Sequence, residues 1–139
     1  MSMVIVDSSV WVDALWGTVN RHSRWLSEAI GKEPIGLTSV ILCEVLQGTR
    51  TEAQFQQSRR RLLELPIFET FAAEVAVAAA HNYRFLRANG ITVRKPIDCM
   101  IATFCIQAGH RLLHRDKDFD AFELHLGLQV LHPPQGLSQ

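Results

Sequence analysis

Four carboxylates stand in stretches of this sequence that are otherwise apolar: Asp7, Glu44, Asp98 and Asp116. Asp7, for example, closes the apolar run over residues 3–6. Charged groups are almost never buried alone, because an isolated carboxylate in a low-dielectric interior is strongly unfavourable. The burial becomes favourable if the carboxylates converge on hard cations, since their oxygens are the ligands that Mg²⁺ and Mn²⁺ prefer. The four residues therefore predict a metal site of the kind that assists phosphodiester chemistry.

Two of these carboxylates also have purely local explanations. Asp7 precedes an apolar helical pattern and can act as its N-cap, although Ser8 or Ser9 would do this without a charge. Asp98 falls at the third helical position if Pro96 opens its helix, and the helix dipole favours a carboxylate there by about 0.3–1 kcal/mol. The sequence alone leaves both alternatives open.

Glu44 has no such local explanation. With Thr38 or Ser39 as the cap of its helix, Glu44 lies beyond the first turn, where neither capping nor the dipole accounts for it. The nearest cation in the sequence is Arg50, so a surface-facing Glu44 is the alternative that stays open.

The alternation of Asp116, Asp118 and Asp120 suggests a calcium-binding loop, but the pattern fails. Counted from Asp116, the sixth position should be glycine and is Ala121, and the twelfth should be glutamate and is Gly127. We interpret Asp118 as an accessory metal ligand or a helix cap, and Asp120 as a solvated residue.

Other candidate sites are weaker. His110 and His114 are four residues apart, but a strand between them denies them a shared helical face. No glycine-rich phosphate loop is present in the sequence. Trp11, Trp16 and Trp25 fall at helical spacing, which favours core packing over base stacking.

Length and composition are those of one globular domain. The chain has 139 residues, of which 47% are hydrophobic and 20% charged, and we expect a core over residues 3–132 with a loose tail from Pro133. No apolar run reaches the roughly 18 residues that span a bilayer, and no basic leader precedes the first apolar run.

The three cysteines lie in apolar settings: Cys43, Cys99 and Cys105. This predicts reduced core residues of a cytoplasmic protein.

The 14 basic and 14 acidic residues balance overall. If five acids gather around cations, the 14 basic residues outnumber the remaining acids by five, and the rest of the surface attracts phosphates. The basic groups include Arg84, Arg87, Arg94 and Lys95. For Arg59, Arg60 and Arg61, which also belong to the basic groups, the favoured explanation is a solvated helix face.

Strand and helix patterns alternate along the chain. Strands are expected over residues 3–6, 34–37, 67–69, 111–114 and 128–131. Helices are expected before Gly17, over 20–30, up to Gly48, over 51–65, 71–88 and 96–108, with a helical turn over 117–122. This alternation predicts an α/β fold with a parallel sheet between helices, whose ligand site lies beyond the carboxyl ends of the strands. Asp7 and Asp116 both follow strands, which places them at that edge.

Four motifs occur in one order across the chain: DSSVWVD at 7–13, EVLQG at 44–48, PID at 96–98 and RDKDF at 115–119. Together they resemble the PIN domain, and specifically the toxin ribonucleases of VapBC toxin–antitoxin pairs, over residues 3 to about 132. The resemblance implies a single PIN-like domain over residues 1–139, with a five-stranded parallel sheet of order 3-2-1-4-5 and an acidic pocket at its carboxyl edge.

The resemblance also implies an acidic quartet with a frequent fifth member: Asp7, Glu44, Asp98, Asp116 and Asp118. Ser9 matches the small polar residue that the family places beside the first aspartate. His114 is a departure, because the family often has threonine or serine there.

The implied function is a metal-dependent endoribonuclease that acts as the toxin of a type II toxin–antitoxin pair. Asp7 and Asp98 are the preferred ligands of Mg²⁺ or Mn²⁺, Glu44 binds metal or acts as general base, and Asp116 completes the cage. The implied partners are tRNA or rRNA as substrate, a VapB-type antitoxin and a second copy of the chain, with no membrane.

Two other functions stay open. The acidic pocket of a metal-free binding module would receive a basic residue from a partner. An aspartyl-phosphate phosphotransfer enzyme would use Asp7 as nucleophile, but such enzymes usually carry a second aspartate where this chain has Ser9.

Overall fold

The central element of the fold is strand β1 (Val4–Val6), whose three side chains are all buried. An apolar run of this kind is typical of a strand covered on both faces. The computed structural model describes residues 2–70 and 72–135. Within them β1 is joined by four further strands: β2 (Ile35–Thr38), β3 (Ile67–Phe68), β4 (Arg111–Leu113) and β5 (Gln129–Val130).

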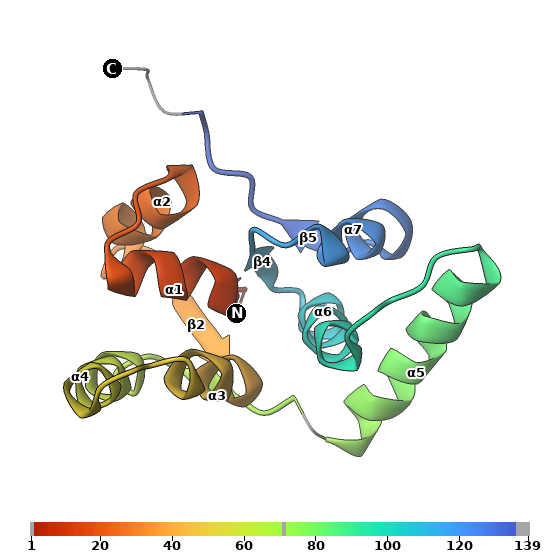
Figure 1. The fold of residues 1–139 in the computed structure, drawn as a ribbon. Helices are drawn as coiled ribbons and strands as arrows, with labels where there is room; N and C mark the ends of the chain where they lie inside the picture. The colour runs from red at the N-terminus through yellow and green to blue at the C-terminus, as the bar shows by residue number, and fades with distance from the viewer. Residues whose placement is uncertain (1, 71, 136–139) are drawn as a thin grey trace.

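The five strands form one parallel sheet in the order β3-β2-β1-β4-β5, of which Figure 1 labels β2, β4 and β5. This confirms the expected α/β class and the strand order. Since β1 pairs with both β2 and β4, the sheet grows outward from β1 in two directions, and the carboxyl ends of all five strands meet at one edge.

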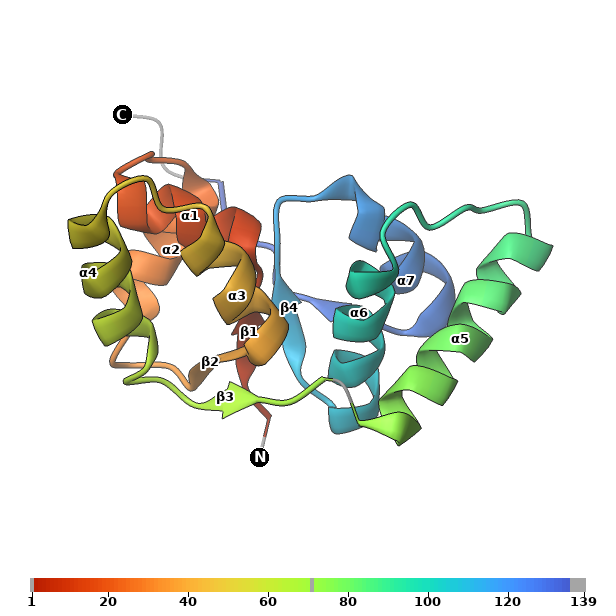
Figure 2. The ribbon, with the colours of Figure 1, turned by 60° about the horizontal axis from the view of Figure 1, so that its bottom comes forward.

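Helices lie on both sides of the central strands. Residues before β3 form α1 (Ser8–Trp16), α2 (Arg21–Ala29), α3 (Ser39–Gln47) and α4 (Glu52–Leu62). Residues after it form α5 (Ala73–Ala88), α6 (Pro96–Ala108), the 3₁₀ turn η1 (Lys117–Phe119) and α7 (Asp120–Leu126). Figure 2 shows α1 to α4 gathered on one side and α5 to α7 on the other.

Helix caps fix where the chain leaves the sheet. Asp7, not Ser8 or Ser9, is the N-cap of α1, since its side chain accepts the Ser9 N–H. Thr38 caps α3 by accepting the Ile41 N–H, as one of the two expected caps. A cap directly after a strand turns the chain sharply, so the first residue beyond β1 is held at the carboxyl edge of the sheet.

Several boundaries differ from expectation. The helix expected over 51–65 ends at Leu62, and the one expected over 71–88 begins at Ala73, while Phe71 lies outside the described residues. The expected turn over 117–122 continues as α7 to Leu126, because the buried Phe122 anchors a full helix. Residues 133–135 of the expected tail have no helix or strand, and residues 136–139 lie outside the described residues.

The core contains two of the three cysteines. Cys99 and Cys105 are buried and free, but Cys43 is exposed, so its expected burial was wrong. Val40, Ile41 and Val45 form the inward face of α3, and this leaves Cys43 on its outer face.

The three tryptophans pack as expected. Trp11 is buried, and Trp16 and Trp25 pack against the core half-buried.

In the described part of the chain, no helix has both the length and the apolar character needed to cross a bilayer.

Candidate metal centre

The first carboxylate of the site leaves the sheet directly after β1. Asp7 is buried, and its Oδ2 accepts hydrogen bonds from the Ser9 N–H at 3.2 Å and the Ser9 hydroxyl at 2.8 Å. The helix-cap explanation for Asp7 is therefore correct, and it is compatible with a second role. Only one carboxylate oxygen takes part in the cap, and Oδ1 is left for other partners.

The loop after β4 brings Asp116 and Asp118 to the same edge of the sheet. The Asp7 N–H donates to the carbonyl of Leu113 at 2.9 Å, which joins the ends of β1 and β4. Asp116 Oδ1 accepts the Asp118 N–H at 2.9 Å and caps η1. The cap that was one alternative for Asp118 is thus supplied by Asp116, which leaves the Asp118 side chain free to face the site.

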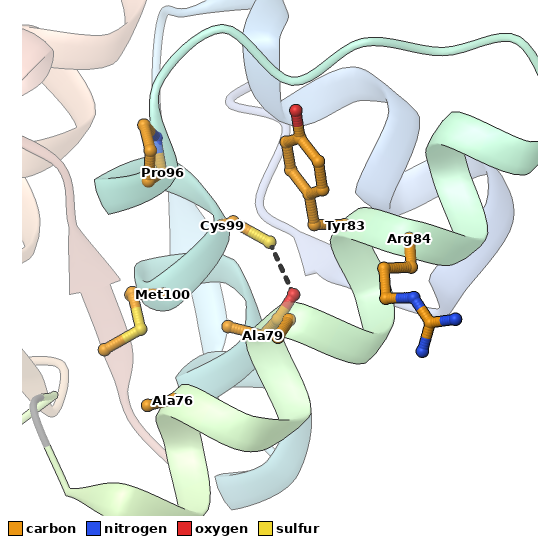
Figure 3. A pocket seen from close by; sticks show the side chains of 8 residues that line it. Ala76, Ala79, Tyr83, Arg84, Pro96, Cys99 and Met100 are labelled. Carbon is orange, nitrogen blue, oxygen red and sulfur yellow. Dashed lines mark hydrogen bonds between the residues drawn. The ribbon is translucent and has the colours of Figure 1, made fainter.

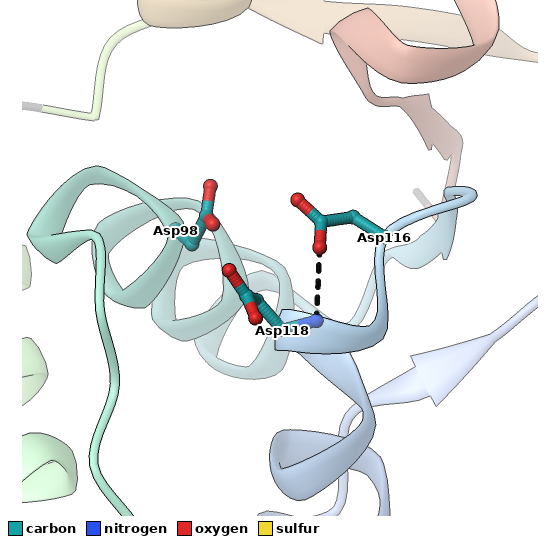
Figure 4. Close-up of side chains that lie close together, drawn as sticks. All are labelled: Asp98, Asp116 and Asp118. Carbon is teal, nitrogen blue, oxygen red and sulfur yellow. Dashed lines mark hydrogen bonds between the residues drawn. The ribbon is translucent and has the colours of Figure 1, made fainter.

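Helix α6 supplies the third side chain. Asp98 is 3% exposed and lies in the first turn after Pro96, as expected. Asp98, Asp116 and Asp118 each offer a carboxylate oxygen, and these atoms lie within 4.8 Å of one another (Figure 4). The structure therefore brings together three of the five expected acids as one cluster, which we call the aspartate trio.

Glu44 approaches from α3. It is half-buried, and its Oε1 accepts a hydrogen bond from the Ser8 hydroxyl at 3.1 Å. Burial and the negative charge of Asp7 raise its pKa. Glu44 is thus directed at the start of α1, beside Asp7, and does not face solvent freely.

The buried carboxylates resist ionisation. Burial raises the pKa of Asp98 to about 6 against the opposing charge of Lys95, and burial likewise raises the pKa of Asp7 despite the Ser9 hydrogen bonds. Burial also disfavours the charge of Asp116, but the Asp118 N–H and Lys95 outweigh it and lower the pKa of Asp116. The site therefore combines one carboxylate that is readily charged with neighbours that need a cation.

Two cations of the loop before α6 partly meet this need. Lys95 Nζ lies 3.1 Å from Asp116 Oδ2 and 3.4 Å from Asp98 Oδ2, and Arg94 pairs with Asp118 at 2.9 Å. From the sequence, Arg94 and Lys95 are expected only to attract phosphates. Their position directly before the Pro96 helix start, with Lys95 three residues and Arg94 four residues from Asp98, is the signal that would have found this role.

The aspartate trio fits a divalent cation. Asp98 Oδ2 and Asp118 Oδ2 are buried and accept no hydrogen bond from the described residues 2–70 and 72–135, although Lys95 lies within ion-pair distance of the former. Buried carboxylate oxygens without donors are strongly unfavourable, and a metal ion would satisfy both. A set of carboxylate oxygens with no nitrogen or sulfur ligand suits Mg²⁺ or Mn²⁺.

The other sequence candidates are not part of the trio. Asp120 is exposed, as expected. His110 and His114 lie at opposite ends of β4, where His110 Nδ1 accepts the Met3 N–H and His114 Nδ1 accepts the Asp116 N–H. They form no common site, but His114 contacts the loop that carries two of the aspartates.

The fold and this centre define an α/β protein with a carboxylate site at the carboxyl edge of a parallel sheet. In comparison with known families, the PIN domain matches residues 4–123. The chain therefore belongs to the PIN-domain family, which confirms the resemblance expected from its motifs.

Two curated relatives are similar to the chain over most of its length. VapC ribonuclease Mb1587 of Mycobacterium bovis and ribonuclease VapC11 of Mycobacterium tuberculosis are each 34% identical to it over 132 residues. The match covers 92% of this chain and 97% of each relative.

Solved structures share the fold at lower identity. FitAcB from Neisseria gonorrhoeae has a TM-score of 0.74 and 20% identity, covering 94% of this chain and 98% of that chain. VapBC2 from Rickettsia felis, bound to a DNA fragment from its promoter, has a TM-score of 0.73 and 17% identity. The match covers 92% of this chain and 96% of that chain. Both similarities concern the fold.

Proposed function

We propose that this chain is a Mg²⁺- or Mn²⁺-dependent endoribonuclease and the toxin of a type II toxin–antitoxin pair. The observation that carries the proposal is the aspartate trio, whose oxygens converge within 4.8 Å at the carboxyl edge of the sheet. The VapC ribonucleases that match along nearly the whole chain support it. RNA as substrate implies activity in the cytoplasm.

Asp98, Asp116 and Asp118 would hold the metal, with Asp7 Oδ1 as a further ligand. A bound divalent ion lowers the pKa of a water molecule and stabilises negative charge on phosphate oxygens. Glu44 is suited to accept a proton, because its pKa is raised and Oε1 is already held by Ser8, which leaves Oε2 as the acceptor atom. Ser9 holds Asp7 in place through two hydrogen bonds.

The substrate that we propose is a single-stranded loop of tRNA or rRNA, since unpaired bases are the usual target of sequence-specific RNA readers. Arg84 and Arg87 are exposed on α5, and Arg94 and Lys95 border the trio. Cations in these positions attract the phosphates on either side of the cleaved bond.

We propose a VapB-type antitoxin as partner, and a homodimer as the assembled form of the chain. An apolar groove of about 370 Å³ runs between α5 and α6 (Figure 3). Its lining includes Ala76, Ala79, Ala80, Tyr83, Cys99 and Met100. The groove shares α6 with Asp98, so an apolar antitoxin segment seated there would lie beside the metal centre.

The test is cleavage of total RNA by the purified chain with Mg²⁺, with Mn²⁺ and with chelator. Asp98→Asn should abolish cleavage, whereas Asp120→Asn, an identical change at an exposed aspartate outside the trio, should leave it intact. Discrete fragments that need metal support the proposal, and end mapping identifies the RNA. Fragments that persist in chelator or in Asp98→Asn would contradict it.

One observation favours a second function, a metal-free binding module. The Lys95 ammonium already lies between Asp98 and Asp116, so the pocket accepts an organic cation. A folded chain that binds no metal, cleaves no RNA and captures an arginine-bearing peptide would support this function. The phosphotransfer alternative is less favoured. It requires Asp7 as the nucleophile, but Oδ2 of Asp7 already accepts two hydrogen bonds from Ser9.

A further inference from the structure

His114 occupies a buried position at the end of β4, and its role follows from its hydrogen bonds. It is 8% exposed, and its ring lies 4.9 Å from that of Phe119. Its Nδ1 accepts the backbone N–H of Asp116 at 3.0 Å. Because Asp116 belongs to the aspartate trio, this bond acts on the backbone of a candidate metal ligand.

The hydrogen bond determines the protonation of the ring. An Nδ1 that accepts an N–H must carry a lone pair, so the neutral ring bears its hydrogen on Nε2. The other neutral tautomer and the imidazolium would both direct an N–H of the ring at the N–H of Asp116. Nε2 is buried and has no hydrogen-bond partner in the described residues. The polar contact of this side chain is therefore made through Nδ1.

Two side chains, two positions apart in the sequence, hold the loop in the same way. Each accepts the N–H of the residue two positions later: His114 that of Asp116, and Asp116 that of Asp118. Serine and threonine hydroxyls and aspartate carboxylates commonly make such turns. The imidazole Nδ1 of His114 thus supplies an acceptor of the kind that a hydroxyl or a carboxylate supplies in such turns.

We propose that His114 is a positioning residue that fixes the turn from β4 into η1, so that the carboxylates of Asp116 and Asp118 reach the metal. This inference rests on the proposed metal-dependent function. His114 does not touch the metal in this role, and it acts through the backbone of Asp116. Partners that orient metal ligands typically contribute about 10–100-fold in metal affinity.

The matched variants are His114→Asn and His114→Leu. Both shorten the side chain by the same amount and both lose the ring contact with Phe119, but only asparagine keeps an acceptor near the position of Nδ1. We expect the affinity for Mn²⁺ to fall about tenfold in His114→Leu and to stay close to that of the unsubstituted chain in His114→Asn. Titration calorimetry measures this, and thermal unfolding in chelator checks that both variants are folded.

A second measurement does not depend on metal. Long-range ¹H–¹⁵N spectra of the metal-free chain should show the Nε2–H tautomer, and hydrogen exchange at the Asp116 amide should be faster in His114→Leu than in His114→Asn. Equal Mn²⁺ affinity in the two variants, or an Nδ1–H tautomer, overturns the role of His114. A chain that binds no Mn²⁺ overturns the proposed function and the role of His114 toward metal, while the amide exchange still decides the hydrogen bond.

Discussion

At Asp98, burial and the charges of Asp7 and Asp116 all act in one direction, and Lys95 alone opposes them. The result is a carboxyl group whose pKa is about 6 in the folded chain, compared with an ordinary value of 3.8. Ionised Asp98 is therefore a source of instability at neutral pH unless a cation joins it. The charge state of Asp98 would therefore report the binding of a metal ion to the aspartate trio.

The first prediction concerns pH. Since the folded state holds the Asp98 proton more tightly than the unfolded state, stability falls as pH rises from about 4 to above 6. Asp98→Asn removes this loss. In chelator at pH 7, the free energy of unfolding of the variant should therefore exceed that of the unsubstituted chain by on the order of 2–3 kcal/mol, whereas at pH 4 the two should differ little. Denaturant unfolding across this pH range measures the difference. Curves that stay parallel would contradict the assigned pKa.

Lys95 gives the second prediction. Its ammonium pairs with two carboxylates that a metal would also use, so it would compete with a metal ion for them. The Lys95 side chain is 55% exposed, and a pair this accessible contributes up to about 1 kcal/mol. Lys95→Met should therefore raise Mn²⁺ affinity about threefold to fivefold, while Lys32→Met, at an exposed position outside the trio, should not change it. A lower affinity in Lys95→Met would instead show that the ammonium supports metal binding.

At the residue scale, the sequence predicts acids better than it predicts their neighbours. Asp98 and Asp116 stand out because each is a charged residue in an otherwise apolar stretch, and this pattern is visible in the sequence alone. The pairing of Lys95 with Asp98 is local, at a spacing of three residues, but its pairing with Asp116, 21 residues along the chain, depends on the tertiary fold. The acceptor role of His114 Nδ1 likewise depends on a backbone turn.

Among the elements, β1 and β4 position the site because their ends are joined. The Ser9 hydroxyl donates to Asp7 Oδ2 at 2.8 Å and accepts the Arg115 N–H at 3.1 Å. One side chain in the first turn of α1 thus holds the carboxylate after β1 and the loop after β4. Arg115 and Asp13 add an ion pair between the same two segments.

The third prediction follows from this link. Ser9→Ala leaves the Arg115 N–H without its acceptor and removes the hydroxyl donor to Asp7 Oδ2, although the Ser9 N–H still donates to it, so stability should fall by about 1–3 kcal/mol. The affinity for Mn²⁺ should fall about tenfold or more, because Asp7 and the Asp116 loop lose their common support. Calorimetry and thermal unfolding measure both effects, with Ser27→Ala on the exposed face of α2 as control. A stability loss with unchanged metal affinity would limit Ser9 to a structural role.

The order of elements could be predicted because each leaves a local signal. The buried run of β1, the cap at Thr38 and the glycine stops mark their own boundaries. The extension of α7 to Leu126 and the shortness of β3 (Ile67–Phe68) could not be predicted, because packing against other elements decides them. The strand order came from the motif resemblance, since pairing partners are not written in single segments.

Over the whole molecule, the neutral formal charge conceals an uneven distribution. Acids gather at the carboxyl edge of the sheet, whereas Arg84 and Arg87 lie exposed on α5 and Arg59 to Arg61 lie exposed in the last turn of α4. Figures 1 and 2 place α4 and α5 on opposite sides of the central strands. Of the two helices that carry these arginines, α5 packs directly on α6, and α6 carries Asp98.

The fourth prediction separates the two basic groups. Binding of single-stranded RNA weakens with salt, and each phosphate contact contributes about 0.7 to the slope of log affinity against log salt. Arg84→Gln with Arg87→Gln should weaken binding and reduce this slope, because both lie on the helix beside the proposed site. Arg59→Gln with Arg60→Gln should change neither quantity. Filter binding from low to high salt tests this, and a larger effect of the α4 pair would relocate the RNA.

The exposure of Cys43 allows the unsubstituted chain to be labelled at one position. Thiolates are the reactive form of cysteine, and burial raises the pKa of Cys99 and of Cys105, while Cys43 faces solvent. A maleimide dye should therefore attach at a single position on the native chain, one residue from Glu44, and mass spectrometry should count one adduct before unfolding and three after it. Fluorescence from that dye would follow a partner as it covers the site, on a protein with no substituted residue.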